Sequence, residues 1–238
     1  MSRNIAITGA SSEIGLAICE RLIGAADRAV LQCHYHPERL ASLAEKNKNI
    51  EMIAADFTQA EELERFCRMI KETDLLINAA AVVKTDLLVQ AAAKDIADML
   101  TVNIQAVIQT CSAVIPAMVG RRTGCIVNLS SVAAQRGNRG QAVYAGSKGF
   151  VEAFTRSLAA EYGGKGVRVN AVAPGPIESG SLKGLLSYAS NQVRDSIVSN
   201  RLGTPQDVAA LVAFLCSDEA AFINGKIYAI DGGFCRGV

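Results

Sequence analysis

Two residues near the middle of the chain have the side-chain types and the spacing that proton transfer requires. Tyr144 and Lys148 are four residues apart in a segment of helical pattern, so their side chains are expected on one face of a helix. A lysine ammonium beside a phenol favours the phenolate and is expected to lower the pKa of Tyr144 from about 10. Such a tyrosine can donate a proton to a carbonyl oxygen as a hydride arrives, or accept one in the reverse direction.

Ser131 stands thirteen residues before Tyr144, just after an apolar run that predicts a strand. A residue at the carboxyl end of a parallel strand lies at the edge where open α/β sheets bind ligands. The Ser131 hydroxyl is therefore a candidate to hold a substrate oxygen and to stabilise the charge that develops on it. The alternative is a half-buried Tyr144 and a solvated Lys148 without a role, because this spacing recurs by chance in many helices.

The segment Thr8–Gly15 has the pattern of a turn that binds the pyrophosphate of a dinucleotide. It follows an apolar run and opens a helical one, and a helix N-terminus offers unpaired N–H donors to phosphate. The candidate contacts are Thr8, Gly9, Ser11, Ser12, Ile14 and Gly15. Glu13 stands where such turns usually have their middle glycine, and we expect its carboxylate to point outward. An ordinary tight turn is the competing interpretation, since many strand-to-helix turns contain glycine.

The segment after the second predicted strand indicates which dinucleotide would bind. An acidic residue about twenty positions past the glycines would bind the ribose diol of NAD. The stretch Cys33–Arg39 has no carboxylate at that position and carries His34, His36 and Arg39 as donors. This pattern favours a 2′-phosphate and predicts NADP(H), with His34 as a candidate contact. The two histidines have no third ligand, so no metal site is predicted; surface histidines without a role are the commoner alternative.

Short apolar runs alternate with longer stretches of helical period along the whole chain. The runs are continuously apolar, as expected of parallel strands covered by helices on both faces. They lie at Asn4–Thr8, Ala29–Cys33, Ile50–Ala54, Leu75–Asn78, Cys125–Leu129, Val167–Val172 and Lys226–Ala229. The helical stretches lie near 13–24, 38–47, 59–71, 94–119, 142–162 and 205–217. This order predicts an α/β fold with a doubly wound, seven-stranded parallel sheet, in a single domain over residues 1–238, with a substrate flap near 179–200.

The composition limits the partners and the location of the protein. The 238 residues carry a formal net charge of +1, which gives no electrostatic argument for nucleic acid or an anionic membrane as a partner. Seven scattered cysteines, without a Cys-x-x-Cys pair, favour a reducing compartment over a disulfide framework or a zinc site. The first predicted strand begins within a few residues of Met1, and the apolar runs are far shorter than a bilayer span. We expect a soluble, cytoplasmic protein.

Taken together, these motifs resemble the short-chain dehydrogenase/reductase family, and the resemblance extends over essentially the whole chain. The family is similar in having a Thr-Gly-x-x-x-Gly-x-Gly turn, which is matched at Thr8, Gly9 and Gly15 but not at Glu13. The stretch Ile77-Asn78-Ala79-Ala80 resembles the family's Asn-Asn-Ala-Gly strand end, without its first asparagine and its glycine. The stretch Asn128-Leu129-Ser130-Ser131 resembles the region of its catalytic serine.

The resemblance implies a Rossmann-like fold and gives roles to residues that spacing alone does not assign. It implies a catalytic tetrad of Asn103, Ser131, Tyr144 and Lys148, in which Asn103 holds a relay water. It also implies cofactor contacts at Asp56 for the adenine, at Asn78, Tyr144 and Lys148, and over the nicotinamide at Pro174, Gly175, Ile177 and Ser179.

The C-terminal half most resembles 3-oxoacyl-[acyl-carrier-protein] reductases, at Arg201–Pro205, Phe222–Gly225 and Asp231–Gly233. This resemblance implies NADPH-dependent reduction of a 3-oxoacyl thioester, in a fatty-acid or polyketide pathway. It also implies a homotetramer paired through the helices near 94–119 and 142–162. Arg122 and Lys165 take the positions of basic residues that dock an acidic acyl carrier protein beside the site entrance. Solvated loop charges are the alternative interpretation of these two residues.

Two other functions stay open from the sequence. One is a dehydrogenase or reductase of a small cyclic or secondary alcohol or ketone, with the same tetrad. The other is a non-catalytic nucleotide-binding sensor or structural subunit, which the departures at Glu13 and Ala80 leave possible. The oligomer is equally open, because the small residues of the second helix suit a close helix contact and packing on the sheet alike; they are Ala142, Ala145, Gly146, Gly149 and Ala153.

Overall fold

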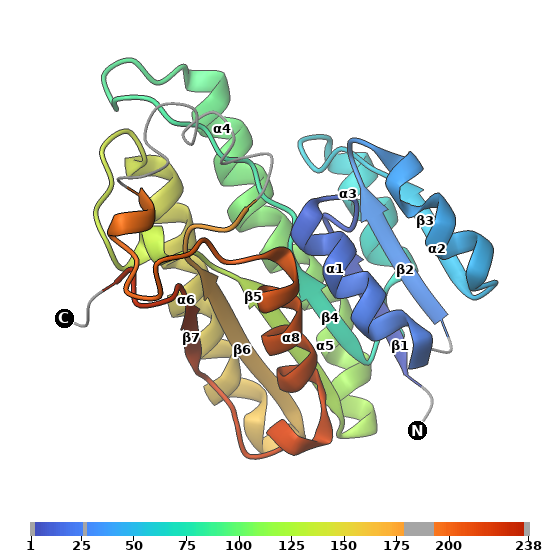
Figure 1. Cartoon of the computed structure of the whole chain (residues 1–238). Coiled ribbons are helices and arrows are strands. Elements are labelled where there is room, and N and C mark those ends of the chain that lie inside the picture. Colours follow the sequence, from blue (N-terminus) through green and yellow to red (C-terminus); the bar gives the residue numbers. More distant parts are fainter. Residues whose placement is uncertain (1–2, 26–27, 179–192, 236–238) are drawn as a thin grey trace.

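A single parallel sheet of seven strands runs through the centre of the molecule (Figure 1). The computed structural model describes residues 3–25, 28–178 and 193–235. The strand order is β3-β2-β1-β4-β5-β6-β7. The strands are β1 (Asn4–Thr8), β2 (Arg28–Cys33), β3 (Ile50–Ala54), β4 (Leu75–Asn78), β5 (Gly124–Leu129), β6 (Val167–Pro174) and β7 (Ile227–Ile230). The predicted doubly wound sheet is confirmed, and every predicted strand is present with its ends within two residues of the prediction.

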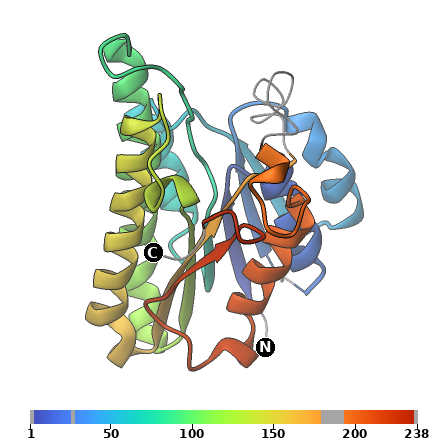
Figure 2. The same cartoon turned by 60° about the vertical axis from the view of Figure 1, so that its left-hand side comes forward.

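Helices cover both faces of the sheet, as Figure 2 shows from the side. One face carries α1 (Glu13–Leu22), α2 (Ala41–Lys46) and α8 (Pro205–Cys216), and the other carries α3 (Ala60–Met69), α4 (Ala93–Leu100), α5 (Ala106–Arg121) and α6 (Ala142–Tyr162). Successive strand residues point to opposite faces. In β1, Ile5 and Ile7 pack on the α1 side, and Ala6 between them packs on the α5 side. Both faces of the sheet are therefore buried, which explains why the strands are apolar throughout.

The predicted helix near 94–119 is interrupted. A π-helical segment, Thr101–Gln105, joins α4 to α5 and contains the completely buried Asn103. Such π turns insert one extra residue into an α-helix and are frequent at functional sites. The hydrophobic period continues through the insertion, so the sequence pattern gave no sign of it.

The joined helix Ala93–Arg121 is long and apolar enough to span a bilayer by length and composition, because an 18-residue window of it has a mean hydropathy of 1.5. Its uninterrupted apolar runs are short, as expected, but the polar residues that divide them do not lower the average much. Half of this helix window is buried inside the molecule, where α5 packs on the sheet. A core helix of a globular domain passes the same test, so the helix is weak support for a membrane span.

The sheet reverses its winding direction between β1 and β4. From β1 the chain adds β2 and β3 on one side, and then returns to place β4 on the other side of β1. Crevices at such a switch point, outside the carboxyl ends of the strands, are where open α/β sheets bind ligands. Thr8, Asn78, Leu129 and Pro174 end β1, β4, β5 and β6 at this edge. The candidate residues for cofactor and substrate should therefore gather here.

Candidate active site

Tyr144 and Lys148 occupy the first turns of α6, as predicted, and the helix brings Lys148 to the end of β5. The Lys148 side chain is buried, and its ammonium donates a hydrogen bond of 2.8 Å to the carbonyl oxygen of Leu129. The Lys148 Nζ lies 5.9 Å from the centre of the Tyr144 ring. The two side chains are thus neighbours on one helix face, while the direct hydrogen-bond partner of the lysine is the strand.

Ser131 follows β5 directly and begins a short 3-10 turn, Val132–Ala134. Its Oγ accepts a hydrogen bond of 3.1 Å from the backbone N–H of Ala133. Because the hydroxyl uses its oxygen for this contact, its hydrogen stays available for donation. The Ser131 side chain is also close enough to the Tyr144 hydroxyl to influence its pKa. The structure therefore brings the predicted serine, tyrosine and lysine into one cluster.

Burial controls the protonation of this cluster. It lowers the pKa of Lys148 to about 8, since an ammonium loses its hydration in the interior. It also raises the pKa of Tyr144 above its ordinary value, and the neighbouring Ser131 side chain opposes that rise. The predicted net lowering of the Tyr144 pKa below its ordinary value is therefore wrong for this structure. The reason is that desolvation of the phenolate outweighs the other influences on Tyr144.

Asn103 lies beside this cluster, and its side chain is fully engaged with protein groups. It accepts a 2.8 Å hydrogen bond from the N–H of Val82 and donates to the carbonyl oxygen of Val82 at 2.9 Å. Its amide also donates to the Oγ of Ser147 at 3.1 Å. Asn103 thus fastens the segment after β4 to α6. A relay water held by this residue stays a prediction, and the side-chain amide shown here serves the scaffold.

The predicted nucleotide turn forms between β1 and α1 as expected. Thr8 Oγ1 accepts hydrogen bonds of 3.0 Å from the N–H groups of Ala79 and Ala80, which joins the turn to the end of β4. Gly9 has a φ of +65°, and a Cβ there would lie 2.8 Å from the Cα of Ala80. A Cβ on Gly15 would overlap the carbonyl oxygen of Gly9. Only glycine fits at these two positions, so the turn can wrap closely around the helix N-terminus.

Ser12 caps α1, because its Oγ accepts a hydrogen bond of 3.0 Å from the N–H of Gly15. Glu13 is the first residue of the helix and is partly buried, as is Ile14. A carboxylate in the first helical turn interacts favourably with the helix dipole. The outward orientation expected for Glu13 stays a prediction.

The segment after β2 approaches the same turn from the side. The Oγ of Ser11 donates a hydrogen bond to the carbonyl oxygen of Tyr35, and Arg39 Nη1 donates to the carbonyl oxygen of Ser11 at 3.4 Å. His34 stacks on Tyr35, and its Nε2 lies 3.6 Å from a carboxylate oxygen of Asp56. The predicted adenine and ribose contacts, His34 and Asp56, are thus side by side, with Arg39 close to the phosphate turn.

Gln32 is a site residue that the sequence reasoning missed. It is buried in β2, where its Oε1 accepts a hydrogen bond of 2.8 Å from the N–H of Gly9. Its Nε2 donates to the carbonyl oxygen of Ala55 at 2.7 Å. Gln32 therefore holds the glycine turn and the end of β3 together. The available signal was a single polar residue within the apolar run Ala29–Cys33.

The Asn78 side chain faces the interior of the sheet. Its amide donates to Asn128 Oδ1 at 2.9 Å, and its oxygen accepts from Thr110 Oγ1 at 2.8 Å. Asn128 in turn donates to Thr155 Oγ1 at 2.9 Å. This buried network links β4 and β5 to α5 and α6 just below the switch point. The side chain of Asn78 is consequently occupied, and contact with a cofactor would have to come from its backbone.

The segment after β6 runs over the carboxyl edge of the sheet toward β7. Gly175 donates its N–H to the carbonyl oxygen of Ile230, and a Cβ there would lie 2.6 Å from the Cβ of Asp231. Ile177 is buried and pairs with Gly203 in an isolated parallel bridge. Ser179 and most of the predicted flap near 179–200 lie outside the described residues. In the part described, Ile197 is buried.

Arg122 and Lys165 do not lie beside the site within one chain. Arg122 ends α5 just before β5, and Lys165 follows α6 just before β6, so both are at the amino edge of the sheet. Arg122 Nη2 donates to the carbonyl oxygen of Gly164 at 3.2 Å. The two cations are therefore neighbours, but six-residue β5 separates Arg122 from Ser131. At about 3.3 Å per residue that strand spans roughly 20 Å, so the predicted placement at the entrance is wrong for a single chain.

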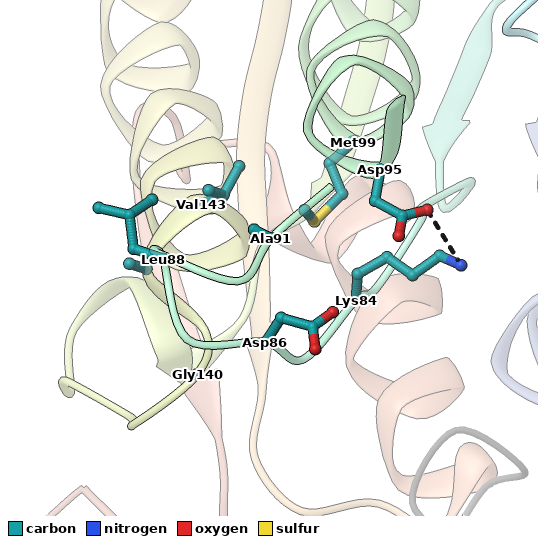
Figure 3. Close-up of a pocket in the computed structure, with 9 residues that line it drawn as sticks. Lys84, Asp86, Leu88, Ala91, Asp95, Met99, Gly140 and Val143 are labelled. Carbon is teal, nitrogen blue, oxygen red and sulfur yellow. Dashed lines mark ion pairs between the residues drawn. The ribbon is translucent and has the colours of Figure 1, made fainter. Parts of the chain in front are cut away.

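Figure 3 shows a small pocket between the segment after β4, α4 and the start of α6. It is lined in part by Lys84, Asp95 and Val143, and the Lys84 ammonium pairs with Asp95 at 3.3 Å. Its volume of about 10 Å³ is room for about one water molecule. A larger hollow, of about 290 Å³, lies at the opposite edge of the sheet near Ile50. Neither cavity contains a predicted catalytic residue.

Comparison with known proteins agrees with this geometry. A family model described as enoyl-(acyl carrier protein) reductase matches residues 9–235. A 3-oxoacyl-[acyl-carrier-protein] reductase of Vibrio cholerae is 33% identical over 231 residues, 95% of each chain. An acetoacetyl-CoA reductase of Allochromatium vinosum is 30% identical over 244 residues, 98% of each chain.

A similar solved structure is that of a candidate NAD(P) dependent gluconate 5-dehydrogenase from Beutenbergia cavernae, which holds NADP at low occupancy. It superimposes with a TM-score of 0.93 at 28% identity, and the match covers 99% of this chain and 97% of the other. The matches span nearly the full length of the chain, and the residues 9–235 of the family model include Gly9–Gly15 and Tyr144–Lys148. The chain belongs to the short-chain dehydrogenase/reductase family of oxidoreductases.

Proposed function

We propose that the protein is an NADPH-dependent reductase that converts a 3-oxoacyl thioester to its 3-hydroxyacyl form. The observation that carries the proposal is the cluster of Ser131, Tyr144 and Lys148 at the carboxyl end of β5, in which burial raises the pKa of Tyr144. A phenol with a raised pKa keeps its proton at neutral pH, and a proton donor is what carbonyl reduction needs. The resemblance of the chain to 3-oxoacyl and acetoacetyl thioester reductases supports the choice of substrate.

The residues of the turn after β1 suit a dinucleotide. Gly9 and Gly15 leave no room for side chains between the turn and the first helix, so backbone N–H groups can approach a pyrophosphate closely. Arg39, next to Ser11, and His34 would hold a 2′-phosphate, which favours NADPH over NADH. The nicotinamide, when bound, supplies the hydride that reduces the substrate carbonyl.

The protein side chains would then orient the ketone and deliver the proton. The Ser131 hydrogen would be donated to the keto oxygen, so that the developing negative charge is stabilised. Tyr144 would donate its proton to the same oxygen. Lys148, held by Leu129 at the strand end, lies close enough to stabilise the phenolate that remains. Asn103 keeps the segment after β4 in place beside them.

The experiment is a spectrophotometric assay of cofactor oxidation with acetoacetyl thioester, carried either on coenzyme A or on an acyl carrier protein. NADPH and NADH are compared in parallel, and gluconate oxidation with NADP is measured as the competing activity. We expect turnover of the thioester with NADPH, at a kcat/KM at least about 10-fold above that with NADH, from one to two charge-assisted hydrogen bonds. Gluconate turnover without thioester turnover would contradict the proposal in favour of a sugar-acid dehydrogenase.

The cofactor choice has its own test. Arg39→Ala is expected to lower kcat/KM for NADPH by about 10-fold while leaving that for NADH within about 2-fold, because the additional phosphate is the part of the cofactor that the guanidinium would contact. Lys46→Ala, an exposed cation at the end of α2, serves as the matched control and should change neither value. Equal losses with both cofactors would show that Arg39 only supports the Ser11 turn.

The seven cysteines are all free thiols, which suits the reducing cytoplasm that we propose as the location.

A further inference from the structure

Glu152 is a buried carboxylate next to the catalytic cluster, and the proposed reduction gives it no role. It lies on α6 one helical turn after Lys148 and is only 9% exposed. A buried carboxylate is costly unless protein groups hydrogen-bond to it. The contacts of Glu152 therefore indicate which part of the molecule it holds.

Those contacts reach both ends of the turn that carries Ser131. One oxygen of Glu152, Oε1, accepts hydrogen bonds from the Oγ of Ser130 at 3.1 Å and from the Nε2 of Gln135 at 3.0 Å. Ser130 immediately precedes Ser131, and Gln135 follows the 3-10 turn Val132–Ala134. A single oxygen on α6 thus fastens the two ends of the segment 130–135.

Other contacts make this segment stiff, so that holding its ends fixes its middle. The Ser130 Oγ also lies 3.3 Å from the carbonyl oxygen of Lys148, and its N–H donates to Val172 at 2.7 Å. Within the turn, the N–H of Ala134 donates to the carbonyl oxygen of Ser131 at 3.0 Å. The helix that carries Tyr144 and Lys148 therefore also fixes the position of Ser131, through the hydrogen bonds of Glu152.

We propose that Glu152 is a positioning residue, which holds the Ser131 turn against α6 so that the Ser131 hydroxyl meets Tyr144 and the substrate oxygen. The proposal rests on the proposed reductase chemistry, because it assigns Ser131 its role there. The proposal does not depend on an electrostatic effect of the Glu152 carboxylate on Tyr144. What matters is an acceptor oxygen at this place on the helix.

The sharpest test measures Tyr144 itself and needs no substrate. Difluorotyrosine placed at position 144 is more acidic than tyrosine, so its titration can be followed by absorbance at a pH where the protein stays folded. Glu152→Ala should raise the pKa of this residue, since the displaced Ser131 no longer stabilises the phenolate. Glu152→Gln keeps an acceptor oxygen and should leave the pKa unchanged or lower it slightly. Loss of a nearby negative charge alone would lower the pKa in both variants, so the two explanations predict opposite signs for Glu152→Ala.

A double-mutant cycle identifies the route of the effect. Ser131→Ala should raise the same pKa, and adding Glu152→Ala to it should raise it no further, because both changes remove one interaction. Glu161→Ala, an exposed carboxylate on the same helix, is the matched control and should have no effect. Additive shifts, or an unchanged or lowered pKa in Glu152→Ala, would overturn the proposal.

Turnover gives a second readout. Once a substrate is identified, Glu152→Ala should lower kcat about 10-fold or more and leave KM and the cofactor Kd within about 2-fold. This is the effect expected when one hydrogen-bond donor, the Ser131 hydroxyl, is no longer in position. Glu152→Gln should recover most of the rate. If Glu152→Ala does not fold, Gln135→Ala can replace it, because it removes an exposed hydrogen-bond partner of Glu152 at the far end of the segment. It should also raise the pKa of residue 144 and lower kcat, by smaller amounts. A wild-type protein that reduces no thioester would contradict the proposed function, while the titration would still decide the role of Glu152.

Discussion

At the scale of single residues, Tyr144 and Lys148 illustrate how one environment acts in opposite directions on an acid and a base. Burial disfavours the charged form of each, so the pKa of the phenol rises and that of the ammonium falls. At neutral pH the tyrosine therefore carries its proton, and the lysine, with a pKa of about 8, is still mostly charged. This combination suits a site that gives a proton away and then stabilises the anion left behind.

Replacing Tyr144 with Phe removes only the hydroxyl that donates the proton. We expect kcat to fall by roughly 100- to 10,000-fold, the usual contribution of a positioned general acid. The cofactor Kd should stay within about 2-fold, because the ring still fills its place. Titration of bound NADPH by fluorescence and a single-turnover assay would measure the two quantities. A variant with unchanged turnover would leave the non-catalytic nucleotide-binding function as the better explanation.

The lowered pKa of Lys148 makes a prediction about stability. Below about pH 8 the lysine is protonated in both the folded and the unfolded chain, and the cost of burying the ammonium is fully present. Above that pH the folded protein releases this proton while the unfolded chain, with a pKa of 10.5, keeps it. The contribution of Lys148 to the free energy of unfolding should therefore rise with pH, by about 1 to 2 kcal/mol between pH 8 and pH 9.5.

Urea unfolding of the wild type and of Lys148→Met, measured across this pH range, isolates the contribution of Lys148. The difference between the two proteins should grow in favour of the wild type as the pH rises. A difference that stays constant would show that the lysine keeps an ordinary pKa in the folded state.

At the scale of secondary-structure elements, the sequence predicted what depends on a repeating pattern. The continuously apolar strands and the helical period of α6 were identified within one or two residues, since burial on both faces leaves a clear signature. The π turn at Thr101–Gln105 was missed because one inserted residue barely disturbs the apolar pattern. The position of Arg122 was misjudged because a residue before a parallel strand and one after it lie at opposite edges of the sheet.

The catalytic cluster was predictable for a related reason, since its members sit at the ends of elements or on one helix face. The roles of Gln32 and Glu152 were not, because Gln32 is a single polar residue in an apolar strand and Glu152 is one of several polar residues of α6. Nothing in a single sequence shows that such a residue has partners far away along the chain. The same is true of the sign of the Tyr144 pKa, which is decided by how deeply the finished fold buries the ring.

The turn between β1 and α1 predicts a steric effect. Gly15→Ala would place a methyl group against the carbonyl oxygen of Gly9, so the turn must open. We expect a loss of about 1 to 3 kcal/mol in the free energy of unfolding, as for other overpacked sites, together with weaker cofactor binding. Gly120→Ala in α5 is the control, because a Cβ there meets open space and should instead stabilise the helix by up to about 1 kcal/mol. Thermal unfolding and cofactor titration of both variants check this, and an unchanged Kd in Gly15→Ala would contradict the assignment of the turn.

At the scale of the whole molecule, the structure separates two interpretations of the small residues on α6. Residues that pack a helix on its own sheet should be buried, whereas residues that admit a second copy should be exposed. Ala142, Gly146 and Ala153 are exposed, and a Cβ on Gly146 or Gly149 would meet nothing within 4 Å. Among the described residues, this face of the helix is therefore largely left uncovered. Together with the family resemblance, it supports the proposal that the protein is a tetramer paired through α5 and α6.

A single charged substitution on this face tests the assembly without disturbing the core. Ala153 is exposed and lies more than two helical turns beyond Tyr144, so one chain can accommodate Ala153→Arg. In a close pair of symmetry-related helices, however, the same change brings two desolvated guanidinium groups together. Light scattering on the eluting protein should give four times the 25.1 kDa of one chain for the wild type, and half of that mass or less for Ala153→Arg. Gln206→Arg, an exposed position on α8, is the control and should leave the mass unchanged.

Because the helix that carries Ala153 also carries Tyr144 and Lys148, the assembly is expected to affect catalysis as well. If the Ala153→Arg protein splits and keeps its cofactor affinity but loses turnover, pairing of the helices stiffens the catalytic helix. An unchanged mass for Ala153→Arg would mean that the helices pair elsewhere, and a wild type of 25.1 kDa would rule out the tetramer.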